Sequence, residues 1–300
     1  MILCKNCSNP IQYNGEQYLC SSCDLNYPIN NGIIDLSKNL DENKTYYPED
    51  SFDTLYKIEE ASFWFKVRNT IISQTITRYL PPPAEVIEVG CGTGFVASAM
   101  HKLGYTVDCA DLFPEALAFC MKRNAGRHYF TLNLEERIFV EEYDAVCAFD
   151  VIEHIENDLL ALTNMYRLLK NGGYAFITVP ACPSLWNAGD VISEHKRRYT
   201  MKELSDKVEE AGFRISKMTY FMALLFPLLY MKRKITGNSL NDDSCLQDIK
   251  DDCLAQLNPN PLVNKLLYTI FSIEPLLLRH MNLPIGGSLL CVAQKKERTK

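Results

Sequence analysis

Residues 84–94, AEVIEVGCGTG, join a short apolar run to three glycines at alternate positions. The run VIEV is typical of a buried strand, and a glycine-rich turn lets a ligand pass close to the backbone. In sheets whose parallel strands alternate with helices, ligands bind at the carboxyl ends of the strands, where such a turn lies. The stretch therefore predicts a ligand-binding loop behind the first strand of an α/β domain.

The segments that follow alternate between strand-like and helix-like patterns, which predicts right-handed crossovers and a parallel sheet covered by helices on both faces. In chain order they read AEVIEVG, FVASAMHKLG, YTVDCAD, PEALAFCMKRN, HYFTLNL, YDAVCAFD, NDLLALTNMYRLLKNGG and YAFITVP. Two further strands, FRISKMTYF and GGSLLCVAQK, flank an apolar insertion at about residues 223–285. We expect a doubly wound α/β domain over residues 84–300, with a helical insertion before the last strand.

The composition is that of an ordinary globular protein, because 47% of the residues are hydrophobic and 23% are charged. A formal charge of −6 provides no general attraction to phosphate backbones, so nucleic acid is not the expected partner. The first residues, MILCKNCSNP, lack the basic and apolar parts of a secretory signal. We therefore expect a cytoplasmic protein whose 12 cysteines stay reduced.

Four cysteines near the N-terminus have the spacing of a structural metal site. Cys4 and Cys7 form one C-x-x-C pair and Cys20 and Cys23 form a second, with 12 residues between the pairs. Four thiolates so arranged can surround structural zinc, whereas a redox C-x-x-C needs no second pair. The sequence predicts a zinc ribbon over residues 1–36. Its one lysine against three acidic residues favours a structural or partner-docking role over phosphate binding.

A carboxylate follows the second predicted strand. Asp111 stands 21 residues after Gly90, where a side chain can accept hydrogen bonds from both hydroxyls of a ribose; a solvated loop aspartate is the alternative. The spacing G-x-G-x-G lacks the last glycine of the dinucleotide fingerprint, which counts against a nicotinamide cofactor. Together with Glu88, the pattern E-V-G-C-G-T-G followed by Asp111 resembles the S-adenosylmethionine site of class I methyltransferases.

The resemblance covers about residues 61–222 and 286–300, and it implies a seven-stranded Rossmann-like methyltransferase sheet. The cofactor-binding positions that it implies are Glu88, Gly90, Cys91, Gly92, Gly94, Asp111, Leu112, Asn133, Asp150, Trp64 and Arg68. By it, Asp111 binds the ribose and Leu112 packs on the adenine. Asn133 stands where the family often has an aspartate that meets the adenine amino group, and its side-chain oxygen can accept the same hydrogen bond. The resemblance also implies that residues 37–83 form a linker and an N-terminal lid helix that contains Trp64. Packing of an amphipathic helix is the alternative explanation for this tryptophan.

Methyl transfer from a sulfonium is an in-line displacement, so the protein must align the acceptor and, for a hydroxyl, remove a proton. The segment AFDVIEHIEND, residues 148–158, resembles the family's stretch that faces the methyl group. This resemblance implies that Asp150, Glu153 and His154 lie near the acceptor. His154 is a candidate general base because imidazole titrates near neutral pH; a histidine with a purely structural hydrogen bond is the alternative.

A second cluster lies in LWNAGDVISEHKRRYT, residues 185–200. His195 is the other candidate base, and the arginines after it either bind an acidic group of the acceptor or stay solvated. The pair Thr200 and Glu203 forms a T-x-x-E capping box that predicts the start of a helix. Because some relatives bind a divalent cation through similar sets, a further hypothesis is a catalytic ion held by acidic and histidine side chains. Its ligands would be Asp150, Glu153, His154 and His195.

The insertion contains two apolar stretches, 222–237 and 260–284, each interrupted by proline. We expect their helices to be too short to span a bilayer. Three interpretations remain open: a hydrophobic lid over an apolar acceptor, ordinary core packing, or a peripheral membrane contact in which Lys232, Arg233 and Lys234 face anionic headgroups.

Together these patterns predict a methyltransferase that uses S-adenosylmethionine, carries structural Zn²⁺ and acts on a small or lipid-linked acceptor, most favourably at oxygen. The expected location is the cytoplasm or the membrane surface. One alternative is an RNA base methyltransferase, because a zinc module joined to this fold also occurs in a ribosomal RNA guanine methyltransferase family. Another is a non-enzymatic adaptor that binds the cofactor and docks a partner through its ribbon. The oligomeric state stays open.

Overall fold

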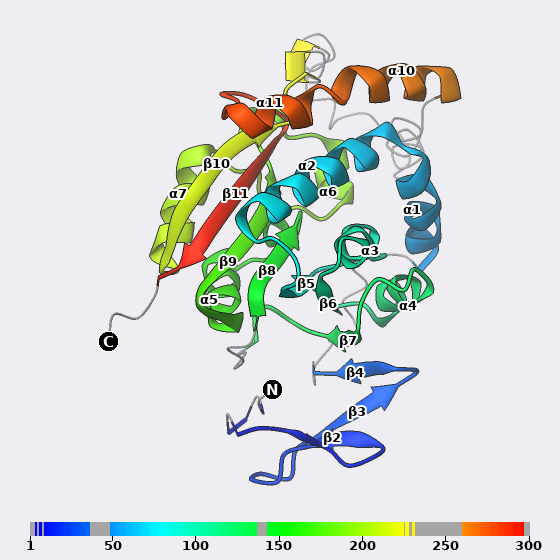
Figure 1. Ribbon diagram of the computed structural model, residues 1–300, viewed down its shortest axis with the longest axis vertical. Helices are drawn as coiled ribbons and strands as arrows, with labels where there is room; N and C mark the ends of the chain where they lie inside the picture. Colours follow the sequence, from blue (N-terminus) through cyan, green and yellow to red (C-terminus); the bar gives the residue numbers. More distant parts are fainter. Residues whose placement is uncertain are drawn as a thin grey trace.

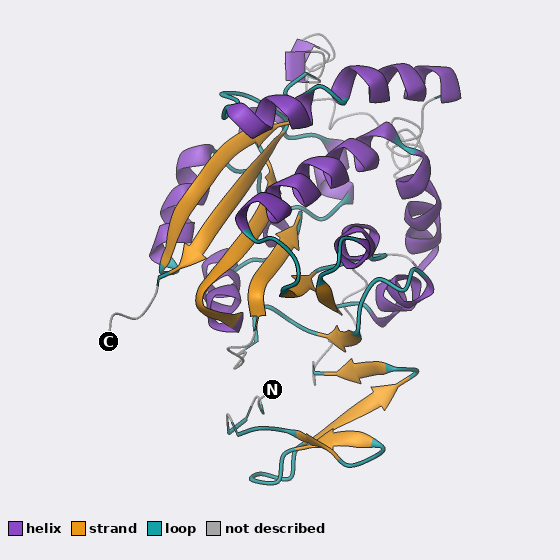
Figure 2. Ribbon diagram, in the orientation of Figure 1, coloured by secondary structure: helices purple, strands orange, loops and turns teal. Residues whose placement is uncertain are grey.

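The computed structural model describes residues 4, 6–7, 9–36, 49–136, 143–224, 226–227, 230–231 and 260–296. These residues form one sheet with helices on both of its faces (Figure 1, Figure 2). The first part of the expected linker, residues 37–48, and the basic run 232–234 lie outside the described residues.

The sheet has the strand order β1-β2-β3-β4-β7-β6-β5-β8-β9-β11-β10. Seven strands form the α/β part: β5 (Glu85–Val89), β6 (Thr106–Asp111), β7 (His128–Thr131), β8 (Tyr143–Phe149), β9 (Leu169–Pro180), β10 (Phe213–Phe221) and β11 (Ser288–Lys295). The strands β7, β6, β5, β8 and β9 run parallel, whereas β11 pairs antiparallel with both β9 and β10. The prediction of a doubly wound, seven-stranded Rossmann-like sheet is confirmed. The chain winds outward from β5 in both directions, so the glycine loop after β5 lies at the topological switch point.

Two cores lie on opposite faces of the sheet, as expected for buried parallel strands. Consecutive residues of β5 divide between them, because Val86 packs with one core and Ile87 with the other. The first core lies under α2 (Phe63–Tyr79), α3 (Phe95–Lys102) and α4 (Pro114–Lys122). The second lies under α5 (Asp158–Leu168) and α7 (Met201–Glu210). Shorter elements at the carboxyl ends of the strands are η1 (Ile152–His154), η2 (Pro183–Leu185) and α6 (Ala188–Ile192).

The four N-terminal strands extend this sheet. They are β1 (Gln12–Tyr13), β2 (Gln17–Leu19), β3 (Asn26–Asn30) and β4 (Ile33–Asp35). Strand β4 pairs in parallel with β7, and Ile33 and Ile34 enter the two opposite cores. The ribbon thereby covers an edge whose backbone groups would otherwise lack partners. The local sequence predicts a strand at the position of β4. It contains no signal for the partner strand β7, which lies roughly a hundred residues further along the chain.

The N-terminal helical segment is divided in two. Helix α1 (Glu49–Ala61) begins inside the expected linker, and α2 follows after a break at Ser62. The Ser62 hydroxyl accepts a hydrogen bond from the Trp64 backbone N–H at 3.3 Å, which makes it the N-cap of α2. The expected single helix is therefore two helices, and this serine capping signal explains the break.

The insertion contributes α10 (Pro261–Phe271) and α11 (Glu274–His280), which both contact α2. In Figure 1 they lie beyond the carboxyl ends of β8 and β9. Taken singly, the two helices have 11 and 7 residues, fewer than the ~20 needed to cross a bilayer. The expectation that this insertion is too short to span a bilayer does not hold for the two together. The joined stretch of 20 residues, 261–280, has a mean hydropathy of 1.2 and is long and apolar enough to do so by length and composition alone. Only 22% of its apolar window is buried in the protein.

Candidate functional site

The glycine loop after β5 is shaped by three left-handed residues. Gly90, Gly92 and Gly94 have φ values of +66°, +53° and +78°. A Cβ at Gly90 would lie 2.4 Å from Val151 Cγ2, and one at Gly94 would lie 2.5 Å from Cys120 Sγ, so packing requires glycine at both positions. A Cβ at Gly92 would meet nothing within 4 Å. Gly92 is therefore the position at which a ligand can approach the backbone.

Asp111 ends the neighbouring strand β6 and lies against this loop. Its carboxylate accepts hydrogen bonds from the backbone N–H groups of Gly92, at 2.7 Å, and Phe113, at 3.0 Å. Burial raises the pKa of Asp111 to about 6. Each carboxylate oxygen has a further lone pair, so the side chain can still accept hydrogen bonds from sugar hydroxyls. Leu112 follows it, half-buried at the same rim.

Asn133 lies in the turn after β7, next to Asp111. The two segments are joined by a hydrogen bond of 2.9 Å, which the backbone N–H of Leu132, the residue before Asn133, donates to the Asp111 carbonyl. The Asn133 side-chain oxygen accepts a hydrogen bond of 2.9 Å from the Glu135 backbone N–H. That oxygen, expected to meet an adenine amino group, therefore already stabilises the turn and has one lone pair left for a ligand.

Glu88 lies within β5, below the loop. It is 3% exposed, and burial raises its pKa well above the usual range. Its Oε2 atom is buried and has no hydrogen-bond partner among the described residues. A buried carboxyl oxygen in this state can take a hydrogen-bond partner from a bound ligand or a water molecule. Cys91 is buried in the same loop.

A polar network that the sequence analysis did not find holds the loop from α1. Glu59 accepts hydrogen bonds from the Thr93 hydroxyl of the loop and from Arg123 Nη2, the latter at 2.8 Å. Glu59 and Thr93 are 6% and 1% exposed, and burial raises the pKa of Glu59 to about 7. The partners lie 34 and 64 positions away in the sequence, so no local pattern indicates this contact.

The predicted lid residues meet the end of β8. Arg68 of α2 forms an ion pair with Asp150 and donates a hydrogen bond of 3.1 Å to Thr178 Oγ1 in β9. Its guanidinium carbon lies 5.7 Å from the centroid of the Trp64 ring. Asp150 adopts a left-handed φ of +56°, which turns the chain sharply after the strand. The structure thus brings Trp64, Arg68 and Asp150 together, with the Asp150 carboxylate directed to α2.

The two candidate bases are neighbours. His154 ends η1, and His195 comes from the loop after α6; their ring centroids are 4.8 Å apart in an edge-to-face arrangement. His195 Nδ1 lies 2.9 Å from Asp190 Oδ1, and Asp190 is 2% exposed. Assigning the Nδ1 proton to this contact leaves Nε2 of His195 as a proton acceptor. Burial and the neighbouring His195 lower the pKa of His154 to about 4, so His154 is neutral at pH 7.

Three of the four expected cation ligands lie together. The ligand atoms of Glu153, His154 and His195 are within 4.8 Å of one another, whereas Asp150 is not part of this group. Glu153 is fully buried, and both of its carboxylate oxygens lack hydrogen-bond partners among the described residues. Burial raises its pKa well above the usual range. The arrangement could hold a divalent cation through three protein ligands.

The arginines of the second cluster are already paired. Arg197 forms an ion pair with Asp158 at 2.8 Å, and Arg198 forms one with Asp190 at 2.8 Å. Both aspartates are buried, so these half-buried guanidinium groups fix the loop in place. The predicted capping box is present, because Thr200 and Glu203 bond each other's backbone N–H groups.

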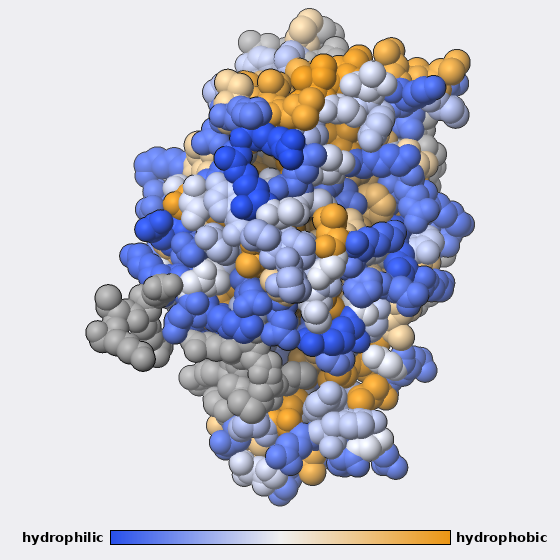
Figure 3. Space-filling model, in the orientation of Figure 1, coloured by the Kyte–Doolittle hydropathy of each residue, from blue (hydrophilic) through white to orange (hydrophobic). Residues whose placement is uncertain are grey.

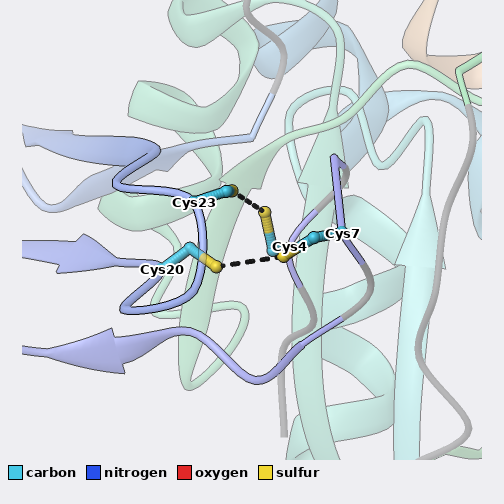
Figure 4. A group of neighbouring side chains, drawn as sticks. All are labelled: Cys4, Cys7, Cys20 and Cys23. Atoms are coloured by element: carbon cyan, nitrogen blue, oxygen red, sulfur yellow. Dashed lines mark hydrogen bonds between the residues drawn. The ribbon is translucent and has the colours of Figure 1, made fainter.

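The four cysteines of the ribbon converge from two turns (Figure 4). The Sγ atoms of Cys4 and Cys23 are 3.5 Å apart and those of Cys7 and Cys20 are 3.3 Å apart. All four sulfur atoms lie within 4.8 Å of one another. Zn–S bonds of ~2.3 Å give a tetrahedral edge of about 3.8 Å, close to these distances and far from a disulfide bond. The cluster therefore has the composition and size of a four-thiolate zinc site.

Comparisons with known proteins agree with this site. Residues 64–217, just over half of the chain, match a family described as a methyltransferase domain. The chain is 28% identical over 127 residues to a ubiquinone biosynthesis O-methyltransferase of Rickettsia bellii, covering 41% of this chain and 53% of that protein. It is 28% identical over 110 residues to a malonyl-[acyl-carrier protein] O-methyltransferase of Serratia marcescens, covering 36% and 43%. The chain thus spans about half the length of the curated relatives that it matches.

A solved structure shows the same fold. Phosphoethanolamine N-methyltransferase 2 of Haemonchus contortus, in complex with S-adenosyl-L-methionine, superposes with a TM-score of 0.55 at 18% identity, covering 85% of this chain and 59% of that one. The chain belongs to the class I S-adenosylmethionine-dependent methyltransferase family. The residues present fit the cofactor of that family: the open face of Gly92, the Asp111 carboxylate and the unpartnered Glu88 oxygen lie around one loop.

Proposed function

We propose that the protein transfers the methyl group of S-adenosylmethionine to an oxygen atom of a small or lipid-linked acceptor. The observation that carries the proposal is the His195–Asp190 pair, which leaves a histidine nitrogen available as a base beside the end of β8. The similar O-methyltransferases support the choice of oxygen, and the apolar stretch 261–280 supports a lipid-linked acceptor.

S-adenosylmethionine supplies an electrophilic methyl carbon when it is bound. We propose that Gly92 offers the open backbone face beneath it, that Asp111 accepts hydrogen bonds from its ribose, and that the Glu88 oxygen orders its amino end. The Arg68–Asp150 pair holds α2 against the site and excludes water. His195 then removes the acceptor's hydroxyl proton, and the buried Asp190 carboxylate stabilises the imidazolium that forms.

We further propose that the four cysteines bind one structural zinc ion and that the protein works in the cytoplasm, at the membrane surface. The sulfur distances support the metal. The ribbon's single lysine and the net charge of −6 favour a small or lipid-linked acceptor over RNA. Retention of zinc by the purified protein at one equivalent would agree with this proposal.

The test is methyl transfer from labelled S-adenosylmethionine to a panel of acceptors: a prenylated catechol, an acyl-thioester carboxylate, a phosphorylated amine and ribosomal RNA. We expect transfer to a hydroxyl or carboxyl oxygen. His195→Ala should lower the rate by roughly 10²- to 10⁴-fold and leave binding of S-adenosylhomocysteine unchanged. Transfer to RNA alone would favour the RNA methyltransferase. Tight cofactor binding without transfer to any acceptor would favour the adaptor.

A second candidate mechanism uses a divalent cation at Glu153, His154 and His195. The two unpartnered oxygens of the buried Glu153 favour it, because a cation would neutralise and satisfy them. Activity that is lost on dialysis against chelator and restored by Mg²⁺, Mn²⁺ or Zn²⁺ would support the cation. Because the ribbon also binds metal in our proposal, the dialysed protein must first be shown to retain zinc. Activity that survives complete loss of other metals would leave His195 as the base.

A further inference from the structure

A pocket of about 700 Å³ lies between the second half of α2 and helix α11. Four side chains that carry or can carry positive charge line it: Arg78 of α2, Lys217 of β10, and Arg279 and His280 of α11. The apolar side chain of Leu278 forms part of the same wall. None of the residues assigned to methyl transfer or to the ribbon lines this pocket, so it is a separate feature of the molecule.

The positive charge in this pocket is not neutralised within the described part of the chain. There, no ion pair joins Arg78, Lys217 or Arg279 to a carboxylate, whereas the better buried Arg123 and Arg198 are paired with glutamate or aspartate. Lys217 Nζ donates to neutral groups, the Leu278 carbonyl at 3.2 Å and Asn282 Oδ1 at 2.8 Å.

Lys217 and Arg78 also repel each other. Burial, together with the charge of Arg78, lowers the pKa of Lys217. The hydrogen bond from Arg78 to the Arg279 carbonyl holds the end of α2 against α11, which keeps these like charges on one wall. An anion between them would offset this repulsion, because it adds an attractive interaction with each of the two cations.

An apolar surface borders the pocket. Helices α10 and α11 and the two residues that flank α11 expose a series of large apolar side chains: Leu262 at 80%, Leu266 at 60%, Ile273 at 52%, Leu276 at 55% and Met281 at 53%. In Figure 3 this apolar band covers α10 and α11, and strongly hydrophilic side chains lie directly beside it. A contiguous apolar surface of this kind marks an interaction site, unlike single exposed leucines.

The two helices are nevertheless fixed to the domain. Asn264 of α10 accepts a hydrogen bond from the Phe63 N–H and donates one to the Ala61 carbonyl, both at 2.8 Å. Glu274 of α11, fully buried, accepts a hydrogen bond from the Ala223 N–H at 3.1 Å. These contacts determine which faces are buried, so the apolar band is the outward face of a docked helix pair.

We propose that the α10–α11 face lies on an anionic phospholipid bilayer and that the pocket between α2 and α11 holds the phosphate of one lipid headgroup. Apolar side chains at the depth of the acyl boundary with basic groups at headgroup level are the arrangement of interfacial helices. The inference rests on the proposed function and deepens it, because it explains how a lipid-linked acceptor reaches the site. The same helix α2 carries Arg68 at the site and Arg78 at the pocket, about 15 Å apart along its axis.

The test is cosedimentation of the full-length protein with vesicles of phosphatidylcholine, with and without 30% phosphatidylglycerol. We expect binding to the anionic vesicles that weakens as NaCl is raised. The double variant Arg78→Gln and Arg279→Gln should bind them roughly 30-fold more weakly. The control is Arg214→Gln with Lys202→Gln, which removes the same charge from exposed positions elsewhere and should bind within twofold of the parent. Leu266→Gln, at an exposed position of α10, should also weaken binding.

Each alternative result would overturn the proposal. Equal losses in the two charge variants would mean that net charge matters and the pocket does not. Release of the protein from vesicles by millimolar inorganic phosphate would mean that the pocket takes a soluble anion. Binding that is equally strong to vesicles with and without phosphatidylglycerol would mean that the pocket has no role in membrane binding. The vesicle assay contains no methyl donor, so it is independent of the activity assay. Vesicle binding by a protein that shows no methyl transfer would contradict the proposed function alone. Methyl transfer by a protein that does not bind the anionic vesicles would contradict this inference alone.

Discussion

Gly92 and Gly94 have similar backbone conformations but face different surroundings. A side chain at Gly94 would meet Cys120 at 2.5 Å and Ala125 at 2.9 Å, whereas one at Gly92 would meet only open space. Both have positive φ values, which strain any other residue. The difference between the two positions is therefore packing at Gly94 and ligand access at Gly92.

Alanine at these two positions should separate stability from binding. We expect Gly94→Ala to destabilise the fold by about 2 kcal/mol or more, because the new methyl group overlaps a helix. We expect Gly92→Ala to cost about 1 kcal/mol of stability but to weaken S-adenosylhomocysteine binding at least roughly tenfold. Thermal melts and calorimetric titration measure the two effects. Equal losses of affinity with no difference in stability would contradict this assignment.

Asp111 should make cofactor binding depend on pH. Burial raises its pKa to about 6, so in the ligand-free protein this carboxyl contributes stability below pH 4 that is lost as the pH rises through about 6. A ribose that donates hydrogen bonds favours the ionised form, so binding has the opposite dependence. We expect S-adenosylhomocysteine to bind about tenfold more weakly at pH 5 than at pH 7. Asp111→Asn should bind weakly at both pH values, and a variant that kept the full pH step would show that another group titrates.

At the scale of elements, α2 connects several parts of the site. Arg68 joins it to Asp150 after β8 and to Thr178 in β9, and Asn264 of α10 bonds the backbone at its start. The helix therefore depends on side-chain contacts with three other elements. Because Arg68 is 8% exposed, loss of its charge would leave the Asp150 carboxylate without its partner at the edge of the site.

Arg68→Met should loosen this lid. We expect a loss of about 1–2 kcal/mol in stability, because the half-buried partner Asp150 is partly solvated, and a larger loss of methyl transfer, because the proposed closed site needs the ion pair. Lys66→Met, on an exposed position of the same helix, is the matched control and should change neither quantity. Unfolding midpoints and initial rates with saturating cofactor provide the measurement. Identical behaviour of the two variants would exclude a special role for Arg68.

At the scale of the whole molecule, the ribbon and the methyltransferase part share one sheet. Strand β4 pairs with β7, and Asp35 accepts a hydrogen bond of 2.6 Å from the Thr131 hydroxyl. Strand β7 ends two residues before Asn133, in the region expected to contact adenine. Loss of the zinc that we propose for the ribbon should therefore affect the edge of the cofactor site.

Cys4→Ser should release zinc and loosen β7. We expect the metal content to fall from about one equivalent to near zero, because a closed four-thiolate site loses one ligand. Faster hydrogen exchange in residues 128–131 should accompany the loss. The control is Cys182→Ser, at a half-buried cysteine outside the cluster, which should keep its zinc. Full zinc in Cys4→Ser would exclude the ribbon site, and unchanged exchange would mean that the β4–β7 pairing does not depend on metal.

The local sequence determined the features whose partners are close along the chain. The glycine turn at 90–94, the two C-x-x-C pairs and the Thr200–Glu203 capping box follow from residues a few positions apart, and the alternation of patterns determined the doubly wound sheet. Such signals survive in any tertiary context, because turn geometry, ligand spacing and hydrophobic period are properties of short segments.

Only the tertiary structure decided the contacts between distant segments. The pairing of β4 with β7 and the link from Glu59 to Thr93 join parts of the chain that share no local pattern. The basic pocket between α2 and α11 arose in the same way. Each of these depends on which helix or strand packs beside which, and that choice is made by burial of the two cores across the whole sheet.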